Sequence, residues 1–296
     1  MKPCNLCPRR CDVDREDGQP GICGVDSHIY VARAALHHWE EPCISGTNGS
    51  GAVFFGGCGL RCVYCQNYDI ATTQVGKEIS RQRLTEIFLE LQNREAANLN
   101  LVTPSHYVLE IIAAMEEARK QGLRIPVVYN TSGYERVETL KMLDGIVDIY
   151  LTDFKYMNEE TAARYSRAGD YPGAVKAALE EMVRQVGQPI FDRKGMMQRG
   201  VIVRHLLLPG HVHEAEQMVK YVHETYGNQV YLSLMNQFTP FERLYDHYPE
   251  IARKVTKREY ETLIDYALDL GVEQAFIQEG DTAEESFIPS FDYEGV

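Results

Sequence analysis

The feature that most restricts the fold is an alternation of short apolar runs with amphipathic helical patterns, which begins near residue 52. The apolar runs have the length and bounding residues of β-strands. We expect strands at 52–55, 99–102, 126–129, 148–152, 201–207 and 230–234. The stretches between them carry apolar residues at helical spacing, as where Val108, Ile111 and Met115 form one stripe. We expect helices at 83–94, 107–121, 135–143, 159–166, 173–186, 213–226 and 257–270, and a final short run at 275–278.

Strands that alternate with helices imply a parallel sheet with right-handed crossovers. About six strand–helix units can be recognised, fewer than the eight that close a full barrel. We therefore expect an α/β fold, namely a partial (β/α)6 barrel of the TIM type. A doubly wound sheet has the same local pattern, and periodicity does not separate the two. In both architectures the functional residues lie at the C-terminal ends of the strands.

The charge balance narrows the class of partner. The chain has 43 acidic and 30 basic residues, and the resulting net charge of −13 disfavours non-specific binding to nucleic acid or anionic membranes. No apolar stretch is long enough to span a bilayer, and the first residues carry charges and cysteines where a signal peptide needs an apolar core. The sequence predicts a cytoplasmic protein with no nucleic-acid or membrane partner.

All eight cysteines lie within the first 65 residues. A disulfide framework is typical of small secreted chains, so these short spacings indicate metal or iron–sulfur ligation instead. Cys58, Cys62 and Cys65 directly follow the first barrel strand with the spacing C-x3-C-x2-C. Three thiolates on one loop leave one iron of a cubane cluster open, which marks a reactive site. Arg61 is expected to offset the negative charge of such a cluster.

This cysteine loop, with Tyr64 before its third cysteine, resembles the signature of radical S-adenosylmethionine (radical SAM) enzymes. The resemblance implies a partial (β/α)6 barrel and a [4Fe-4S] cluster on the three cysteines. It also implies S-adenosylmethionine chelated to the open iron and cleaved reductively, to give a 5′-deoxyadenosyl radical that abstracts hydrogen. A zinc ribbon that pairs Cys4 and Cys7 with Cys62 and Cys65 is the alternative, although it leaves Cys58 unused.

Later segments resemble the pyruvate formate-lyase activating enzymes, the glycyl-radical activase branch of that family. The matching segments are Cys65–Asn67, Asn130–Tyr134, Asp153–Lys155 and Arg204–Gly210. By this match Tyr64, Asn67, Asn130, Ser132, Asp153 and Lys155 are candidate cofactor-binding residues. The Gly-Gly-Glu of the family is missing, and Thr103 stands near its place. His205 and Asn236 are further candidates, His205 by its place on a strand next to Arg204 and Asn236 by its place where activases carry a histidine.

The chain starts with four cysteines, Cys4, Cys7, Cys11 and Cys23, which supply a complete ligand set for one metal site. The site suits either Zn²⁺ or a second, closed [4Fe-4S] cluster, with a structural or electron-transfer role. The run Cys-x-x-Cys-Pro-Arg-Arg-Cys resembles the N-terminal signature of activase-like radical proteins of unassigned substrate. Cys43 is left over and is interpreted as an ordinary buried residue.

We expect three parts: a cysteine-rich, loop-rich metal-binding module at 1–50, a barrel core at 51–240, and a helix with an acidic and aromatic tail at 241–296 that packs on the barrel. The tail could close over the site as a lid or wrap the surface. The predicted function is radical SAM catalysis, with a glycyl-radical enzyme as protein substrate and flavodoxin or ferredoxin as electron donor. A small-molecule or peptide substrate is the alternative, and a zinc-dependent adaptor is the rival from outside enzymology.

Overall fold

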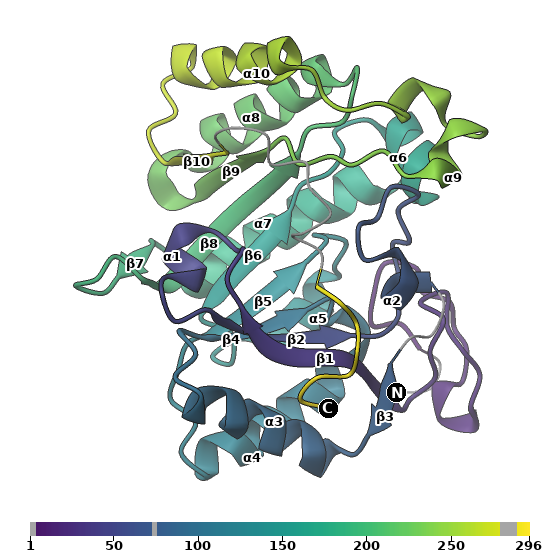
Figure 1. The fold of residues 1–296 in the computed structure, drawn as a ribbon, viewed down its shortest axis with the longest axis vertical. Coiled ribbons are helices and arrows are strands. Elements are labelled where there is room, and N and C mark those ends of the chain that lie inside the picture. Colours follow the sequence, from purple (N-terminus) through teal and green to yellow (C-terminus); the bar gives the residue numbers. More distant parts are fainter. Residues whose placement is uncertain (1–3, 73–75, 279–288) are drawn as a thin grey trace.

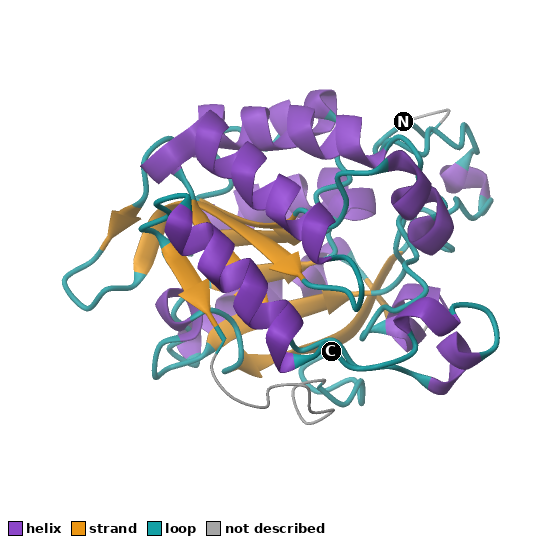
Figure 2. Cartoon of the chain, turned by 90° about the horizontal axis from the view of Figure 1, so that it is seen from above, coloured by secondary structure: helices purple, strands orange, loops and turns teal. Residues whose placement is uncertain are grey.

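A computed structural model describes residues 4–72, 76–278 and 289–296. One mixed sheet forms the centre of the molecule, with helices packed outside it (Figures 1 and 2). Its strands are β1 (Ile29–His37), β2 (Ser50–Phe55), β3 (Lys77–Ile79), β4 (Leu99–Val102), β5 (Val127–Thr131), β6 (Ile149–Asp153), β7 (Ile190–Phe191), β8 (Met197–Leu206), β9 (Tyr231–Met235) and β10 (Ala275–Ile277).

The helices follow the strands in the order expected from the sequence. They are α1 (Pro42–Ser45), α2 (Tyr68–Thr72), α3 (Arg81–Asn93), α4 (Val108–Lys120), α5 (Val137–Lys141), α6 (Glu159–Ser166), α7 (Tyr171–Val186), α8 (Val212–Tyr226), α9 (Glu242–Tyr245) and α10 (Lys257–Asp269). Short 3₁₀ turns occur at η1 (Arg15–Asp17), η2 (Ser105–Tyr107), η3 (Gly227–Gln229) and η4 (Pro249–Ile251). Within the described residues, no helix is both long and apolar enough to cross a bilayer.

The order of the parallel strands decides between the two architectures. Seven strands lie side by side in the sheet in the same order as in the sequence, and every adjacent pair is parallel. They are β2, β4, β5, β6, β8, β9 and β10. A doubly wound sheet reverses its strand order at a switch point. The described strands run through without such a reversal, so the fold is a partial TIM-like barrel, as predicted. β10 extends the six expected units by one further parallel strand.

Residues 29–37 differ from the expected loop-rich module, because they form β1. This strand runs antiparallel to β2, and β3 pairs with its other edge. Its three alanines hide the strand signal, since alanine lacks the branched or aromatic side chain that marks strands in sequence. The chain end also lies along β1: the Ala34 N–H donates to the Glu294 carbonyl at 2.8 Å, and the Tyr293 N–H donates to the Ala32 carbonyl at 3.2 Å (Figure 1).

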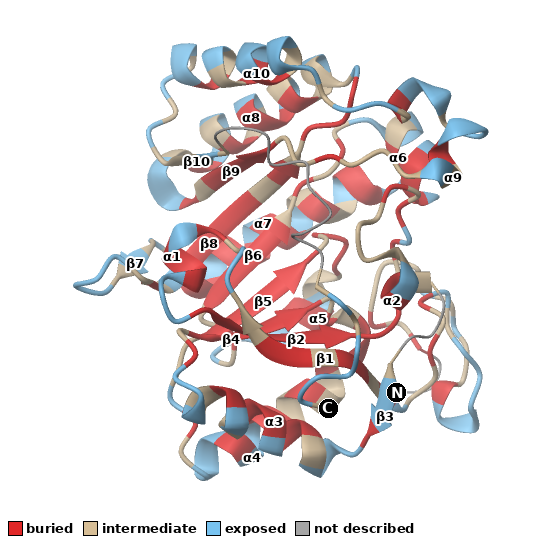
Figure 3. Ribbon diagram, viewed as in Figure 1, coloured by how far each residue is buried: buried red, intermediate tan, exposed pale blue. Residues whose placement is uncertain are grey.

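The apolar core lies between the sheet and the inner faces of the helices, where Figure 3 shows the buried residues gathered. α4 illustrates the pattern: Val108, Ile111, Met115 and Ala118 are fully buried and face the sheet. The helices therefore hold the strands from outside and leave the C-terminal strand ends to the loops that carry polar side chains.

Gly133, just after β5, brings the end of β5 close to the end of β6. Its φ is +76°, and a Cβ there would lie 2.2 Å from the Asp153 carbonyl oxygen. We expect Gly133→Ala to lower the free energy of unfolding by roughly 2–4 kcal/mol, through backbone strain and overpacking together. Urea unfolding would measure the loss.

Gly145→Ala is the matched control, because Gly145 has φ +77° but nothing within 4 Å of the Cβ position. It carries the backbone strain without the steric clash. Equal losses of stability in the two variants would show that the close approach of Gly133 to Asp153 has no energetic consequence.

Candidate active site

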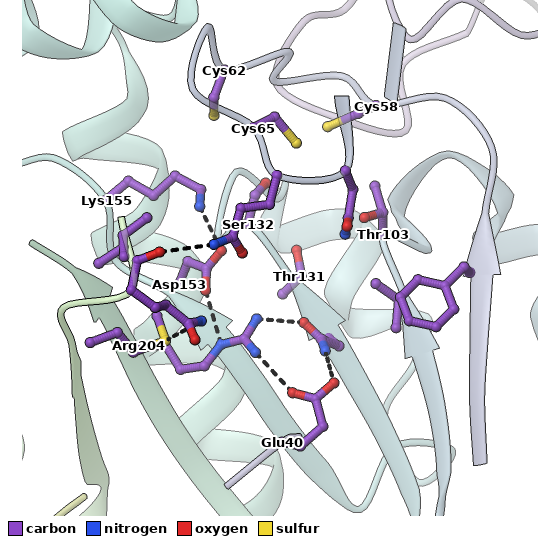
Figure 4. A pocket seen from close by; sticks show the side chains of 18 of the residues that line it. Glu40, Cys58, Cys62, Cys65, Thr103, Thr131, Ser132, Asp153, Lys155 and Arg204 are labelled. Atoms are coloured by element: carbon purple, nitrogen blue, oxygen red, sulfur yellow. Dashed lines mark hydrogen bonds and ion pairs between the residues drawn. The ribbon is translucent and has the colours of Figure 1, made fainter. Parts of the chain in front are cut away.

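A cavity of about 220 Å³ opens at the C-terminal ends of the parallel strands. The loop after β2 contributes Cys58, Cys62 and Cys65, and the ends of the next strands contribute polar side chains (Figure 4). This is the edge where barrel and doubly wound folds place their sites, as the sequence predicted. The C-terminal segment reaches the same cavity through Pro289, while residues 279–288 of the expected tail lie outside the described residues.

The three cysteines of the β2 loop line this cavity together. Burial raises the pKa of the Cys62 thiol, and burial with the neighbouring Cys62 and Cys58 raises the pKa of Cys65 to about 12. Among the described residues, no three His, Cys, Asp or Glu side chains are already drawn together closely enough to hold a metal ion. The donor chemistry nevertheless fits an iron–sulfur cluster, because three soft thiol ligands on one loop face one cavity.

Buried hydroxyl groups and rings support this loop from behind. The Ser166 hydroxyl donates to the Cys62 sulfur at 3.1 Å and lies 2.7 Å from the Tyr156 hydroxyl. Tyr64 lines the cavity, and its ring packs against Tyr156 and Tyr165 with centroids 6.4 Å apart in both cases. Aromatic packing therefore holds the backbone between the second and third cysteines in one position.

A network of charged and amide side chains forms the floor of the cavity (Figure 4). The Asp153 carboxylate accepts from Lys155 Nζ at 2.7 Å and from Arg204 Nε at 3.0 Å. Arg204 also donates to Asn130 Oδ1 at 2.6 Å and to a Glu40 carboxylate oxygen at 3.2 Å. Asn130 Nδ2 in turn donates to Glu40 at 3.2 Å. The network joins the ends of β5, β6 and β8 to the segment that follows β1.

Asp153 and Lys155 hold each other in their charged forms. Burial acts to raise the pKa of Asp153, but the adjacent Lys155 and Arg204 outweigh it and hold that pKa below its usual value. Burial acts to lower the pKa of Lys155, but Asp153 outweighs it and raises that pKa. The cavity thus presents a fixed ammonium group beside the cysteine loop, suited to a carboxylate ligand, and amide and hydroxyl groups suited to sugar hydroxyls.

Most of the candidate cofactor-binding residues line this cavity. Those that do so are Tyr64, Asn67, Thr103, Asn130, Ser132, Asp153 and Lys155. Thr103 adopts a left-handed backbone with φ +59°, and its N–H donates to the Asn130 carbonyl at 2.9 Å. Their contact with a cofactor remains a prediction.

His205 is not among the described residues that line this cavity, so its expected contact with a cofactor stays a prediction without support from the structure. Successive residues of a strand face opposite sides, and on β8 it is Arg204 and Leu206 that line the cavity. His205 is buried on the other side, where its Nδ1 lies 2.7 Å from the Phe154 carbonyl oxygen. Asn236 is likewise not among the described lining residues, whereas its neighbours Met235 and Gln237 are.

Sequence reasoning missed Glu40 and Arg204 as site residues. Arg204 stands in a segment that resembles the family, and a test of strand parity would have selected it instead of His205. Glu40 has no local signal, since only the turn after β1 brings it against β5 and β8. Arg61 is exposed and donates to the Thr72 carbonyl at 3.4 Å, whereas Arg9 and Arg243 donate to backbone carbonyls of the cysteine loop.

The N-terminal cysteines lie apart from this cavity. The sulfurs of Cys11 and Cys23 are 3.3 and 3.2 Å from the Cβ position of Gly21. Cys4 lines a separate, smaller cavity, and burial raises the pKa of the Cys7 thiol to about 12. Cys62 and Cys65 face the barrel cavity, an arrangement that does not favour a zinc ribbon shared with Cys4. A metal on the four N-terminal cysteines remains a prediction.

Cys43 is buried in an apolar cluster that includes Ile44 and Val128, as its interpretation as an ordinary buried residue predicts.

Glu135, just after β5, is a buried carboxyl group whose titration should be visible in stability. Burial raises its pKa to about 7, although hydroxyl groups of Ser105 and Thr131 donate to it. The ordinary value is 4.5, so the neutral form stabilises the fold fully below about pH 4.5, and this contribution is lost as the pH rises through about 7. We expect Glu135→Gln to flatten the decline in unfolding free energy between about pH 4.5 and 7.

Urea unfolding at a series of pH values, wild type minus variant, would measure this effect. Glu138→Gln is the control, since Glu138 is exposed and its pKa is lowered, chiefly by a backbone hydrogen bond, so it does not titrate in this range. If the unfolding free energy of Glu135→Gln declined with pH as steeply as that of the wild type, the decline would be caused by other groups.

Comparison with known proteins agrees with the cysteine motif. The model of the radical SAM superfamily matches residues 52–222. An uncharacterised protein of Methanocaldococcus jannaschii is 30% identical over 283 residues, which cover 91% of this chain and 77% of that protein. The pyruvate formate-lyase-activating enzyme of Clostridium pasteurianum is 27% identical over 116 residues, which cover 36% of this chain and 46% of that enzyme.

Two solved structures are more distant. A domain of a pyruvate-formate lyase-activating enzyme from Bacteroides vulgatus has a TM-score of 0.40 at 13% identity, and the match covers 58% of this chain and 92% of that one. Streptococcus suis SuiB, bound to its precursor peptide SuiA, has a TM-score of 0.49 at 12% identity, with 75% and 46% covered.

Proposed function

Because this chain belongs to the radical SAM superfamily, we propose that it cleaves S-adenosylmethionine reductively and uses the 5′-deoxyadenosyl radical to abstract hydrogen from a protein substrate. The observation that carries this proposal is one cavity lined both by the three cysteines of the β2 loop and by the Asp153–Lys155 pair. When bound there, a [4Fe-4S] cluster supplies the electron that cleaves the sulfonium bond. Cys58, Cys62 and Cys65 would hold it.

The polar residues of the cavity would orient the cofactor. Lys155 would pair with the methionine carboxylate, and its charge is maintained by Asp153 at 2.7 Å. Asn130 and Ser132, at the end of β5, would bind the ribose hydroxyls. Thr103 would receive the methionine amino group through its carbonyl or hydroxyl oxygen. The roles of Asn130, Ser132 and Lys155 rest on the matched family segments and on their position in the cavity. The role of Thr103 rests on its position in the cavity alone, near the place where the family carries Gly-Gly-Glu.

Apolar side chains complete the wall. Phe54, Val102, Leu206 and Met235 line the cavity beside the polar floor. With S-adenosylmethionine bound, they would help to exclude water from the space in which a carbon radical would form, which would limit side reactions of such a species.

The exposed rim of the cavity favours a substrate that enters from outside. S-adenosylmethionine would occupy the cavity, and the substrate would then approach over the rim, where Trp39 is 63% exposed. A flexible loop of a glycyl-radical enzyme suits such access, and flavodoxin or ferredoxin would serve as electron donor.

Low-temperature EPR of the anaerobically reconstituted, reduced protein tests the first part of the proposal. We expect a [4Fe-4S]⁺ signal that changes shape when S-adenosylmethionine is added. A colourless protein that holds only zinc and does not bind S-adenosylmethionine would contradict the proposal and support the adaptor.

The substrate is tested by incubation of the reduced enzyme with S-adenosylmethionine and a purified glycyl-radical enzyme. We expect a doublet radical signal on that partner, absent when S-adenosylmethionine is omitted. Consumption of a metabolite without any protein radical would favour the small-molecule alternative.

A further inference from the structure

Arg9, in the run between Cys7 and Cys11, reaches from the N-terminal module to the cysteine loop of the barrel. Its Nε donates to the Gly59 carbonyl at 2.8 Å, and its Nη2 lies 3.3 Å from the Leu60 carbonyl oxygen. Both carbonyls belong to the stretch between the first and second cysteines of that loop. One side chain therefore binds the backbone that sets the distance between Cys58 and Cys62.

The same guanidinium also binds the end of α6. Its Nη2 donates to the Ser166 carbonyl at 2.7 Å, and its Nη1 donates to the Arg167 carbonyl. Carbonyls at a helix C-terminus lack partners within the helix, and a cation there is favourable. Ser166 is also the residue whose hydroxyl donates to the Cys62 sulfur at 3.1 Å. Arg9 thus holds two segments that converge on Cys62.

Arg243 holds the other end of the loop. It donates to the Val63 carbonyl at 3.0 Å and to the Cys65 carbonyl at 2.6 Å. Its guanidinium lies over the rings of Tyr68 and Phe241, at 4.1 and 4.2 Å from their centroids. The loop backbone is thus bound at both ends by an arginine, while its three cysteine side chains line the cavity.

The N-terminal module also contacts the loop directly. The Cys58 N–H donates to the Cys23 carbonyl at 3.1 Å. A backbone hydrogen bond therefore joins the first cysteine of the barrel loop to the last cysteine of the N-terminal module. A Cβ on Gly57 would lie 2.8 Å from that same carbonyl oxygen, and one on Gly59 would lie 3.5 Å from the Cys7 sulfur. The N-terminal module therefore packs directly on the cysteine loop, so a well-ordered module restricts the conformations of that loop.

We propose that Arg9 is a positioning residue that fixes the loop from Gly59 to Cys62 for cluster binding, and that the N-terminal cysteine module serves as the scaffold of this loop. The inference rests on the proposed function, because it assigns the cluster to Cys58, Cys62 and Cys65. It gives the arginine of the Cys-Pro-Arg-Arg-Cys run a role through backbone carbonyls and not through substrate or cofactor.

Hydrogen–deuterium exchange of the protein without iron tests the positioning directly. In Arg9→Ala we expect amides of residues 58–66 to exchange about tenfold faster, since charge-assisted hydrogen bonds to four carbonyls are lost. Arg9→Lys should lie between wild type and Arg9→Ala, because an ammonium group cannot span the same four carbonyls. Arg10→Ala is the control, as Arg10 is adjacent and exposed.

Reconstitution then connects the loop to the cluster. We expect Arg9→Ala to take up less iron and to give an altered [4Fe-4S]⁺ EPR line shape with S-adenosylmethionine, with Arg10→Ala unchanged. Arg243→Ala tests the opposite end if Arg9→Ala does not fold. Wild-type exchange rates and an unaltered EPR signal in Arg9→Ala would overturn the inference. A wild-type protein without a cluster signal would instead contradict the proposed function, while the exchange experiment would still decide the role of Arg9.

Discussion

Replacing Cys62 with alanine is expected to abolish the formation of 5′-deoxyadenosine and leave the barrel folded. Cys62 is one of three thiols that face the cavity, and a cluster deprived of one protein ligand is no longer held with a single open iron. The lost side chain is small and lies on a loop, so the sheet and its helices keep their packing. Chromatographic assay of 5′-deoxyadenosine after anaerobic reduction would measure the activity, and circular dichroism would verify the fold.

Cys43→Ala is the matched control for this experiment. Cys43 and Cys62 are equally buried, both 6% exposed, but Cys43 packs among apolar residues beside β5 and β6. Its variant should cleave S-adenosylmethionine at the wild-type rate, with at most a modest loss of stability. Normal activity in Cys62→Ala would remove the basis of the proposed function.

Replacing Asp153 with asparagine is expected to lower both stability and cofactor binding. The carboxylate is the shared partner of Lys155 and Arg204, and all three side chains are at most 16% exposed. Removing one partner of a buried pair leaves an uncompensated charge, which costs about 3–5 kcal/mol. Lys155→Met should cost less stability, because Asp153 keeps Arg204 as its partner at 3.0 Å.

The two substitutions should rank differently in their effect on S-adenosylmethionine binding than in their effect on stability. We expect Lys155→Met to weaken binding strongly although it perturbs the fold less, because the ammonium group is the proposed partner of the methionine carboxylate. Calorimetric titration and urea unfolding would measure the two effects. Lys257→Met, which breaks an exposed pair with Glu261 at 3.5 Å, should change stability by less than about 1 kcal/mol. If Asp153→Asn were as harmless as Lys257→Met, the buried network would have no role in holding the site.

The local pattern of apolar residues was sufficient to predict most strands and helices of the barrel. The strand at Leu99–Val102 and the helix at Glu159–Ser166 have the bounds that the sequence predicts, and the other barrel strands differ by a few residues at their ends. β1 was not recognised, because its alanines carry no periodic signal and its pairing with β2 depends on contacts across the sheet. Strand ends are less certain for the same reason, since neighbouring strands decide where pairing stops.

The sequence by itself determined the class of chemistry. The spacing of Cys58, Cys62 and Cys65 after an apolar strand is a local property, and so is the alternation that predicts parallel strands. Tertiary structure alone decided which neighbours complete the site. Glu40 contacts Arg204 across 164 positions of the chain, and Arg9 contacts the Gly59 carbonyl across 50 positions. Such contacts arise when packed elements bring distant side chains together. Because successive side chains of a strand face opposite sides, the orientation of β8 places Arg204 and not His205 in the cavity lining.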